Sequence, residues 1–432
     1  LKFLGTDLTD IGSNAFYHCS SMSGELKIPD EVSTLGYNAF ESCSSFRKLT
    51  LGTGLNSIKS EAFFGCSGLS NTLEIPENIG SIEESAFQGC SEITTLILGS
   101  GVETIGNNAF LSCKKIKELV IPDQVSSIGE YAFSDCIEIS KITYPDPEKS
   151  PNGITFGICA FEGCTGLKEL PIPKIMTRIS EGLFQSCSGI TSITFHDDVT
   201  SIGNYAFQYC KGLTQTLKLP KNLNSLGTSS FEECSLIKSI EFGEGTYSIG
   251  EKAFSCCADL SGKLEFPSNV NTINARAFQY CDHITEITLP ESVTIRAEAF
   301  QFCSLLSTIN YPEVVTSLGN GVFRSCSSLK EFVFPNNIAE IPESFVCNCN
   351  NLDKLTIPDT CTKIGSYAFC NCTSLEKTAK SLAFPEQITQ IGNNAFEGCT
   401  GFTEKLTLSD TITDLGAYAF KNCNKFKKLE LI

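Results

Sequence analysis

Cysteine and histidine often carry nucleophilic or metal chemistry, and this chain of 432 residues has 23 cysteines but only three histidines. The histidines, His18, His196 and His283, lie in distant parts of the sequence, so their spacing assembles no catalytic pair. Paired carboxylates such as Glu83 and Glu84 are typical of solvated loops. We therefore expect no enzymatic activity, no cofactor and no metal site.

The cysteines follow a regular pattern, because eighteen of them close the motif Ala-Phe-x-x-Cys or a variant of it. If the repeats stack as parallel coils, successive cysteines point the same way at a spacing of about 4.8 Å. A disulfide needs converging Cβ atoms about 3.8 Å apart, and a tetrahedral metal site needs ligands that converge on one point. We expect buried free thiols in this column. Its members are Cys19, Cys43, Cys66, Cys90, Cys113, Cys136, Cys164, Cys187, Cys210, Cys234, Cys257, Cys281, Cys303, Cys326, Cys349, Cys372, Cys399 and Cys423.

The five other cysteines are Cys159, Cys256, Cys347, Cys361 and Cys370. Cys347 and Cys370 each stand two residues before a cysteine of the column, which predicts that they are neighbours on adjacent coils at an outward position. Two alternatives remain open for them, a surface disulfide or two solvent-exposed free thiols.

The phenylalanines reveal the repeat that positions these thiols. Fifteen of the seventeen intervals between the motif phenylalanines span 22–24 residues, a period typical of a solenoid coil and too short for a propeller blade. We therefore predict about eighteen coils. The motif phenylalanines are Phe16, Phe40, Phe63, Phe87, Phe110, Phe133, Phe161, Phe184, Phe207, Phe231, Phe254, Phe278, Phe300, Phe323, Phe345, Phe369, Phe396 and Phe420.

One coil, residues 119–136, shows the elements that we expect in each. The Leu-x-Ile pattern at Leu119 predicts a strand that places two side chains inward, and Pro122 ends it because proline donates no ladder hydrogen bond. A second short extended piece runs from Val125, and Gly129 marks the corner after it. The spacing of Phe and Cys at i and i+3 favours a single helical or 3₁₀ turn that faces inward.

The whole chain, residues 1–432, is predicted to be a single solenoid domain, and we expect it to belong to a longer array because neither end carries a polar cap. Insertions near residues 145–153 and 376–381 enlarge two loops, which are candidate binding elements. In the fifteenth coil Phe345 and Cys349 are four residues apart, and Pro342 replaces the usual glycine. We expect that coil to be distorted.

The pattern Leu-x-Ile-Pro-x-x-Val-x-x-Ile-Gly-x-x-Ala-Phe-x-x-Cys, clear around residues 121–139 and 357–375, resembles the BspA-like, or spirochaete-type, leucine-rich repeats. The resemblance covers essentially the whole chain. It implies a leucine-rich-repeat solenoid with a parallel β-sheet on the concave face and short strands and turns on the convex face. It also implies a surface or secreted adhesin that binds matrix proteins, host cells or other microbes.

The concave sheet is the expected contact surface for a protein or other macromolecular ligand. Its outward row lacks Tyr, Trp, Phe and Arg and suits broad polar contact better than a small-molecule pocket. The candidate contacts in this row are Lys27, Thr50, Glu74, Val120, Thr143, Thr194, Lys218, Glu241, Glu265, Thr288 and Thr356.

Charge and hydropathy narrow the classes of partner. The net charge of −17 disfavours nucleic acid, whose phosphates are neutralised by clustered Lys and Arg. No segment has the roughly eighteen consecutive apolar residues that a membrane span needs, so we expect no direct membrane insertion in this segment. Exposed terminal strands favour end-to-end self-association. The alternative function is an intracellular scaffold rod, cytoplasmic or associated with the cytoskeleton, because many unpaired thiols suit a reducing compartment.

Overall fold

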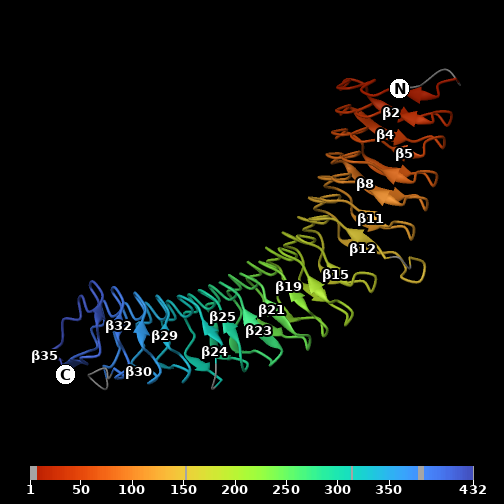
Figure 1. The fold of residues 1–432 in the computed structure, drawn as a ribbon. Helices are drawn as coiled ribbons and strands as arrows, with labels where there is room; N and C mark the ends of the chain where they lie inside the picture. Colours follow the sequence, from red (N-terminus) through yellow and green to blue (C-terminus); the bar gives the residue numbers. More distant parts are fainter. Residues whose placement is uncertain (1–6, 151–152, 313–314, 378–383, 432) are drawn as a thin grey trace. The chain divides into compact units, whose positions relative to one another are not determined.

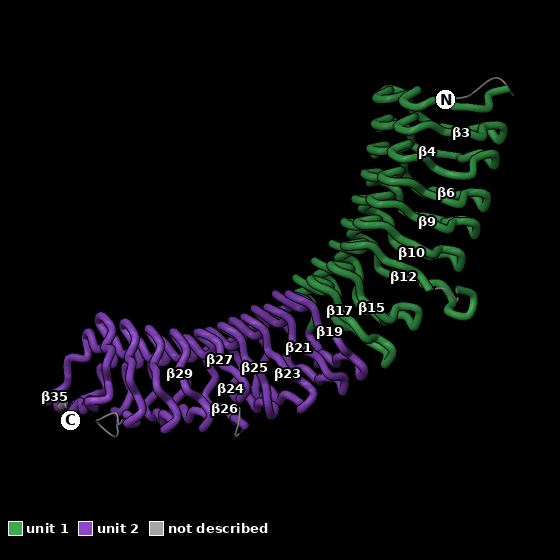
Figure 2. The backbone as a smooth tube through the Cα atoms, viewed as in Figure 1, with its two compact units in different colours: residues 1–213 green, residues 214–432 purple. Residues whose placement is uncertain are grey.

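A computed structural model describes residues 7–150, 153–312, 315–377 and 384–431, and in these ranges the chain forms a parallel β-solenoid without helices. The regular succession of coils can be followed in Figure 1. Contacts divide the chain into two compact units, residues 1–213 and 214–432 (Figure 2). The prediction of about eighteen solenoid coils is confirmed; the assignment of the whole chain to one domain stays a prediction.

In the described ranges the main strands lie where the Leu-x-Ile pattern predicts them. In the first unit these are β2 (Gly24–Lys27), β4 (Phe46–Thr50), β6 (Asn71–Ile75), β8 (Ile93–Leu98), β10 (Glu118–Val120), β12 (Lys141–Thr143), β14 (Glu169–Pro171) and β16 (Ser192–Thr194). In the second unit they are β18 (Thr216–Lys218), β20 (Ser239–Glu241), β22 (Gly262–Glu265), β24 (Ile284–Thr288), β26 (Thr308–Asn310), β28 (Glu331–Val333), β30 (Lys354–Thr356), β33 (Lys405–Leu408) and β35 (Lys428–Leu431).

A short strand follows every main strand except β35. The first unit has β1 (Asp10–Ile11), β3 (Thr34–Leu35), β5 (Ser57–Ile58), β7 (Ser81–Ile82), β9 (Thr104–Ile105), β11 (Ser127–Ile128), β13 (Thr155–Phe156), β15 (Arg178–Ile179) and β17 (Ser201–Ile202). The second has β19 (Ser225–Leu226), β21 (Tyr247–Ile249), β23 (Val270–Ile273), β25 (Thr294–Ile295), β27 (Ser317–Leu318), β29 (Glu340–Ile341), β31 (Lys363–Ile364), β32 (Gln390–Ile391) and β34 (Asp414–Leu415). Two of these short strands, β1 and β32, follow stretches that include residues outside the described ranges.

All the strand pairs are parallel, but the two kinds of strand differ in continuity. Short strands form sheets of up to five strands, such as β5 to β13 in the first unit. Main strands pair mostly in twos, as in β10 with β12 and β14 with β16, with one sheet of three, β22, β24 and β26. The main-strand face is therefore a series of small sheets.

The turn segment that follows the short strand contains no helix, so the expected helical turn is wrong among the described residues. Instead, its N–H groups donate alternately to a carbonyl of the next coil and to a carbonyl of the same turn. The Phe110 N–H donates to the carbonyl of Ala132 in the next coil at 2.8 Å, whereas the Cys113 N–H donates to the carbonyl of Phe110 at 3.1 Å. This alternation links the coils while each turn also closes on itself.

Two residues in every turn segment have left-handed backbone conformation. In the coil around Phe133 they are Tyr131, with φ of 54°, and Asp135, with φ of 57°. They stand just before the Ala and Cys positions of the motif, and most of them are not glycine. We call them the first and second left-handed positions. Gly129 begins this segment because a Cβ there would lie 2.5 Å from the Asn107 nitrogen.

The core consists of stacked columns. Phe110, fully buried, lies between Phe87 and Phe133 with ring centroids 5.4 and 5.2 Å away and nearly parallel planes. The inward residues of the strands, such as Leu119 and Ile128, are equally buried. Dispersion and burial of these columns hold one coil against the next.

The fifteenth coil departs from this column, but not as predicted. Its backbone bonds stay in register, since Val346 N–H donates to the Ala368 carbonyl at 3.0 Å. The expected distortion is therefore wrong. Val346, and not Phe345, occupies the phenylalanine column, and Phe345 takes the alanine position with its ring at 84° to that of Phe323. Phe334 packs against Phe345 in the adjoining space.

The first insertion is a turn attached to the preceding coil. Asp146 N–H donates to a carboxylate oxygen of Asp123 at 3.0 Å, and Ser150 donates to the Asp123 carbonyl. Residues 151–152 of this insertion lie outside the described residues. Of the second insertion only Glu376 and Lys377 are described, and residues 378–381 lie outside them.

Candidate functional site

The main-strand face brings the predicted contact residues side by side. Lys27 pairs in register with Thr50, Val120 with Thr143, and Lys218 with Glu241. Nine of the eleven candidates are exposed, and Thr50 and Thr288 are half-buried. The exposed candidates are Lys27, Glu74, Val120, Thr143, Thr194, Lys218, Glu241, Glu265 and Thr356. Their role in binding stays a prediction.

Ion pairs between adjacent coils order this face. Lys48 lies 2.8 Å from Glu25, and Lys218 lies 3.0 Å from Glu241. Lys354 pairs with Glu331. These side chains are largely exposed, so each pair contributes little stability. The face presents alternating charge to a partner.

A slot opens in the main-strand face of the first unit where β12 and β14 belong to separate sheets. Its volume is about 430 Å³, and Ile142, Leu167 and Leu170 line it together with Tyr144 and polar neighbours. The Tyr144 hydroxyl is buried and has no hydrogen-bond partner. Burial raises the pKa of this hydroxyl far above its usual value, so it is neutral.

The second unit has a slot of the same kind between β26 and β28. It measures about 270 Å³ and is lined by Ile309, Tyr311, Phe332 and Val333, among others. The Tyr311 hydroxyl is also buried without a partner. Tyr144 and Tyr311 each precede a proline, at a position where most coils have Ile, Leu or Phe. The dipeptide Tyr-Pro is therefore the feature of the sequence that could have indicated the slots. The prediction that the face suits broad polar contact better than a small-molecule pocket did not anticipate these two slots.

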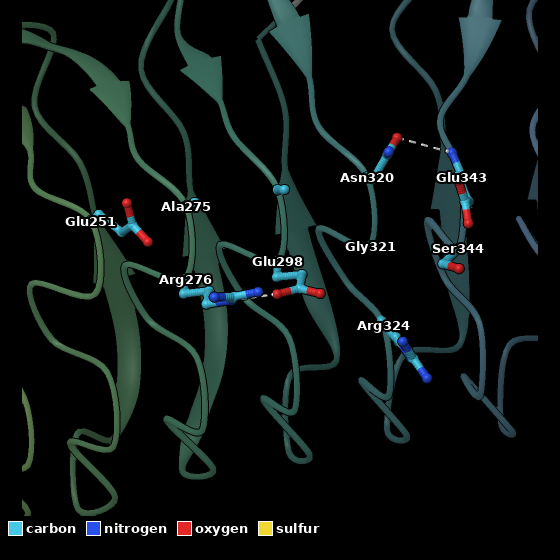
Figure 3. A pocket seen from close by; sticks show the side chains of 10 residues that line it. Glu251, Ala275, Arg276, Glu298, Asn320, Gly321, Arg324, Glu343 and Ser344 are labelled. Carbon is cyan, nitrogen blue, oxygen red and sulfur yellow. Dashed lines mark hydrogen bonds and ion pairs between the residues drawn. The ribbon is translucent and has the colours of Figure 1, made fainter.

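A polar groove lies on the turn segments of the second unit, and Figure 3 shows its lining. Its volume is about 460 Å³. Arg276 and Glu298 form an ion pair across it at 2.5 Å, and the Asn320 side-chain oxygen accepts the Glu343 N–H at 3.2 Å. We call it the arginine groove. It is lined by Glu251, Ala275, Arg276, Ala297, Glu298, Asn320, Gly321, Arg324, Glu343 and Ser344.

Most thiols of the cysteine column are buried and unreactive. All 23 cysteines are free thiols, and 21 of them are buried. In the column the thiol donates to the carbonyl at the phenylalanine position of the preceding coil, as from Cys90 to Phe63 at 3.2 Å. Burial raises the pKa of Cys90 to about 12, so almost no reactive thiolate forms at neutral pH.

Cys347 and Cys370 are neighbours on adjacent coils, as the sequence predicts. The Asn348 N–H donates to the Cys370 carbonyl at 2.7 Å, and the two side chains interact with each other. They are only 6% and 7% exposed, so the alternative of solvent-exposed thiols is wrong. Arg324 and Glu397 flank them in the same column of side chains. The structure records two free thiols, and a disulfide between them stays a prediction.

In the described ranges, two of the three histidines contact main-chain carbonyls. His196 donates a hydrogen bond from Nε2 to the Pro173 carbonyl, and His283 donates one from Nδ1 to the Ala258 carbonyl. No group of three or more His, Cys, Asp or Glu side chains is placed to hold a metal ion among the residues that the structure describes. The same residues include no helix with the length and hydropathy of a membrane span.

Comparison with known proteins places the chain in a family. The family model described as "BspA type Leucine rich repeat region (6 copies)" matches residues 9–140, 132–261, 248–376 and 376–432. None of the curated proteins matches the sequence significantly.

Among solved structures, a leucine-rich repeat protein from Bacteroides ovatus is 22% identical with a TM-score of 0.55, covering 94% of each chain. A leucine-rich cell surface protein from Faecalibacterium prausnitzii is 20% identical with a TM-score of 0.31, covering 100% of this chain and 85% of its own. The pneumococcal vaccine antigen PcpA is 17% identical with a TM-score of 0.41, covering 99% and 95%. The first likeness shows a shared fold, and the family match spans nearly every coil. The chain belongs to the BspA-type leucine-rich repeat family.

Proposed function

We propose that this chain is a non-enzymatic adhesin, on a cell surface or secreted, that binds a macromolecular partner through its main-strand face and the loop at residues 145–153. The family is a repeat scaffold for protein interactions. The resemblance to BspA-like proteins supports the surface location and the adhesive role.

The observation that carries the proposal is the pair of slots in the main-strand face. Each slot is lined by apolar side chains, among them Ile142 and Leu170 in the first and Ile309 and Phe332 in the second. The hydroxyls of Tyr144 and Tyr311 are buried beside thiols of the cysteine column, so a partner in the slot does not reach them. An apolar side chain of a partner would fill the slot and lose its contact with water. The exposed polar row beside each slot supplies the surrounding rim.

The test compares adhesion with fold stability. Beads coated with the whole chain are passed over immobilised matrix proteins and over epithelial cells, and retention is counted. Pro171→Glu and Val333→Glu place a charge at exposed positions that line the two slots, so they should leave the fold stable and lower the affinity about tenfold. Ile137→Glu is the matched control, because Ile137 is exposed but lines neither slot. No retention of the unaltered chain, or equal loss in all three variants, would overturn the proposal.

The second candidate is an intracellular scaffold, and the free thiols favour it. Fractionation of the source cells, with thiol titration of native and denatured protein, separates the two. Buried free thiols in a soluble intracellular fraction would contradict the adhesin.

A further inference from the structure

Arginine is rare in this chain and is concentrated in one place. Of 32 basic residues only five are arginines, and three of these, Arg276, Arg296 and Arg324, fall in three consecutive coils. The other two are Arg47 and Arg178. Arginine differs from lysine because its planar guanidinium binds a carboxylate through two parallel hydrogen bonds. Arg276 and Arg324 both line the arginine groove.

Small residues open the groove. Ala275, Ala297 and Gly321 line it on three successive coils, and Gly321 stands at a first left-handed position with φ of 62°. Other coils carry a large side chain there, for example Tyr131 or Tyr367. A Cβ at residue 321 would meet the Glu298 side chain at 3.4 Å, so a larger side chain would fill the groove. The volume of about 460 Å³ is in the usual range for ligand sites.

The two arginines are not equivalent. Arg276 is engaged by Glu298. Arg324 makes no ion pair or side-chain hydrogen bond that the described residues record, and its Nε is buried without a partner. Figure 3 shows Arg324 on the coil of Gly321, next to the coil of Glu298. Because Arg324 lines the groove without an ion pair among the described residues, a carboxylate bound there would supply one to its terminal guanidinium nitrogens.

The remaining groups limit the kind of acid that fits. Glu251, Glu298 and Glu343 line the groove, and the whole chain carries −17, so a ligand with several negative charges is repelled. A ligand with one carboxylate and several hydroxyls suits it better, because hydroxyls donate to Glu343 and exchange hydrogen bonds with Ser344 and Asn320.

We propose that the arginine groove binds a carboxylated sugar residue, of the uronic or sialic acid class, with its carboxylate on Arg324. This site lies on the turn segments and is independent of the main-strand face. The bound sugar is a terminal or internal residue of an acidic glycan, which the open groove admits.

The test uses the whole chain with methyl β-glucuronide as the probe and the neutral methyl β-glucoside as its matched partner. Saturation-transfer NMR should show binding of the glucuronide, with the glucoside about tenfold weaker, as expected for loss of a charged hydrogen bond. Arg324→Gln should weaken binding of the glucuronide by a similar factor and leave binding of the glucoside unchanged. Arg178→Gln is the control, because Arg178 is exposed and lies outside the groove.

A second variant tests the groove without a change of charge. Gly321→Tyr places in this coil the residue that other coils carry at the same left-handed position, so it should fold and abolish binding. Equal binding of the two sugars, or unchanged binding in Arg324→Gln, would overturn the proposal. A triglutamate peptide that binds at Arg324 while the glucuronide does not would assign the site to acidic peptides instead.

Discussion

The Sγ atom of Cys113 lies 3.2 Å from the main-chain carbonyl oxygen of Phe87, one coil earlier, and donates a hydrogen bond to it. The same pair of positions repeats along the array, for example from Cys136 to Phe110 at 3.3 Å and from Cys281 to Phe254 at 3.2 Å. Each thiol thus gives a second hydrogen bond to a carbonyl that already accepts the N–H of the cysteine in its own turn, as from Cys90 to Phe87 at 3.1 Å. The small size of cysteine alone therefore does not explain why cysteine recurs in this column.

The first prediction concerns alkaline pH. Burial raises the pKa of the column thiols, to about 11 for Cys43 and about 12 for Cys90, from an ordinary value of 9.0. Because the folded pKa is raised, stability is complete below the unfolded pKa and is lost as the pH rises towards the folded value. Near pH 10 each thiol with a folded pKa of about 12 should lower the free energy of unfolding by roughly 1.4 kcal/mol. Thermal unfolding in reductant between about pH 7 and pH 10.5 measures this loss.

Cys113→Ala isolates the thiol contribution, because lysines and tyrosines titrate in the same range. The variant should be less stable than the unaltered chain at neutral pH, and the difference should shrink as the pH rises. Parallel stability curves for the two proteins would contradict the prediction.

Among single substitutions, we expect those in the phenylalanine stack to lower the free energy of unfolding most. Phe110→Ala removes a fully buried ring between two others and should lower the free energy of unfolding by about 3–5 kcal/mol. Hydrogen exchange should show loss of protection first in the coils next to it, since each coil contacts only its neighbours. Leu111→Ala, at the partly exposed next position, is the control and should cost much less.

The fifteenth coil offers a test of register. Val346→Phe adds a ring where Phe334 and Phe345 already fill the space and should cost about 1–3 kcal/mol through overpacking. Phe345→Ala alone should cost about 3–5 kcal/mol. The double variant restores the common Ala-Phe order and should cost less than the sum of the two, as chemical denaturation would show. Additive costs would argue against the assigned register.

The disulfide between Cys347 and Cys370 can be tested by oxidation. Two thiols would form the bond and reduce one glutathione disulfide to two glutathiones. After oxidation, alkylation and tryptic cleavage, mass spectrometry should find peptide 331–354 joined to peptide 364–377. Cys347→Ser should abolish the link. Cys349→Ser should not, because Cys349 and Cys372 in the same coils donate to carbonyls. Failure to form the link, or a link through Cys349, would contradict the prediction.

The repeat could be predicted because its columns depend on residue type. Phe, Cys, and the inward Leu and Ile recur at fixed spacing, which determines the number of coils and the places of the main and short strands. The prediction of Phe345 in the column followed residue type and was wrong, although Val346 stands at the usual three residues before Cys349. The backbone register shows that Val346 is the residue in the column.

The slots and the arginine groove could not be predicted in the same way. Each arises from the relation between neighbouring coils, namely a break between β12 and β14, another between β26 and β28, or small residues on successive turns. The two left-handed positions also escaped prediction, since they hold residues as different as Tyr131 and Gly321. Backbone hydrogen bonds, and not side-chain type, determine those positions.

The left-handed positions separate what a coil contributes to folding from what it can display. Their conformation is held by the bonds between coils, so tyrosine, arginine, glutamate, lysine, asparagine and glycine are all found there. At most of these positions the side chain is at least partly exposed, so a mutation there changes the surface and leaves the core unchanged, but Ser85, Cys159, Ser229 and Asn394 are buried. The exposed left-handed positions can therefore change independently of one another. Substitutions in single coils can alter what the surface recognises while the fold is retained.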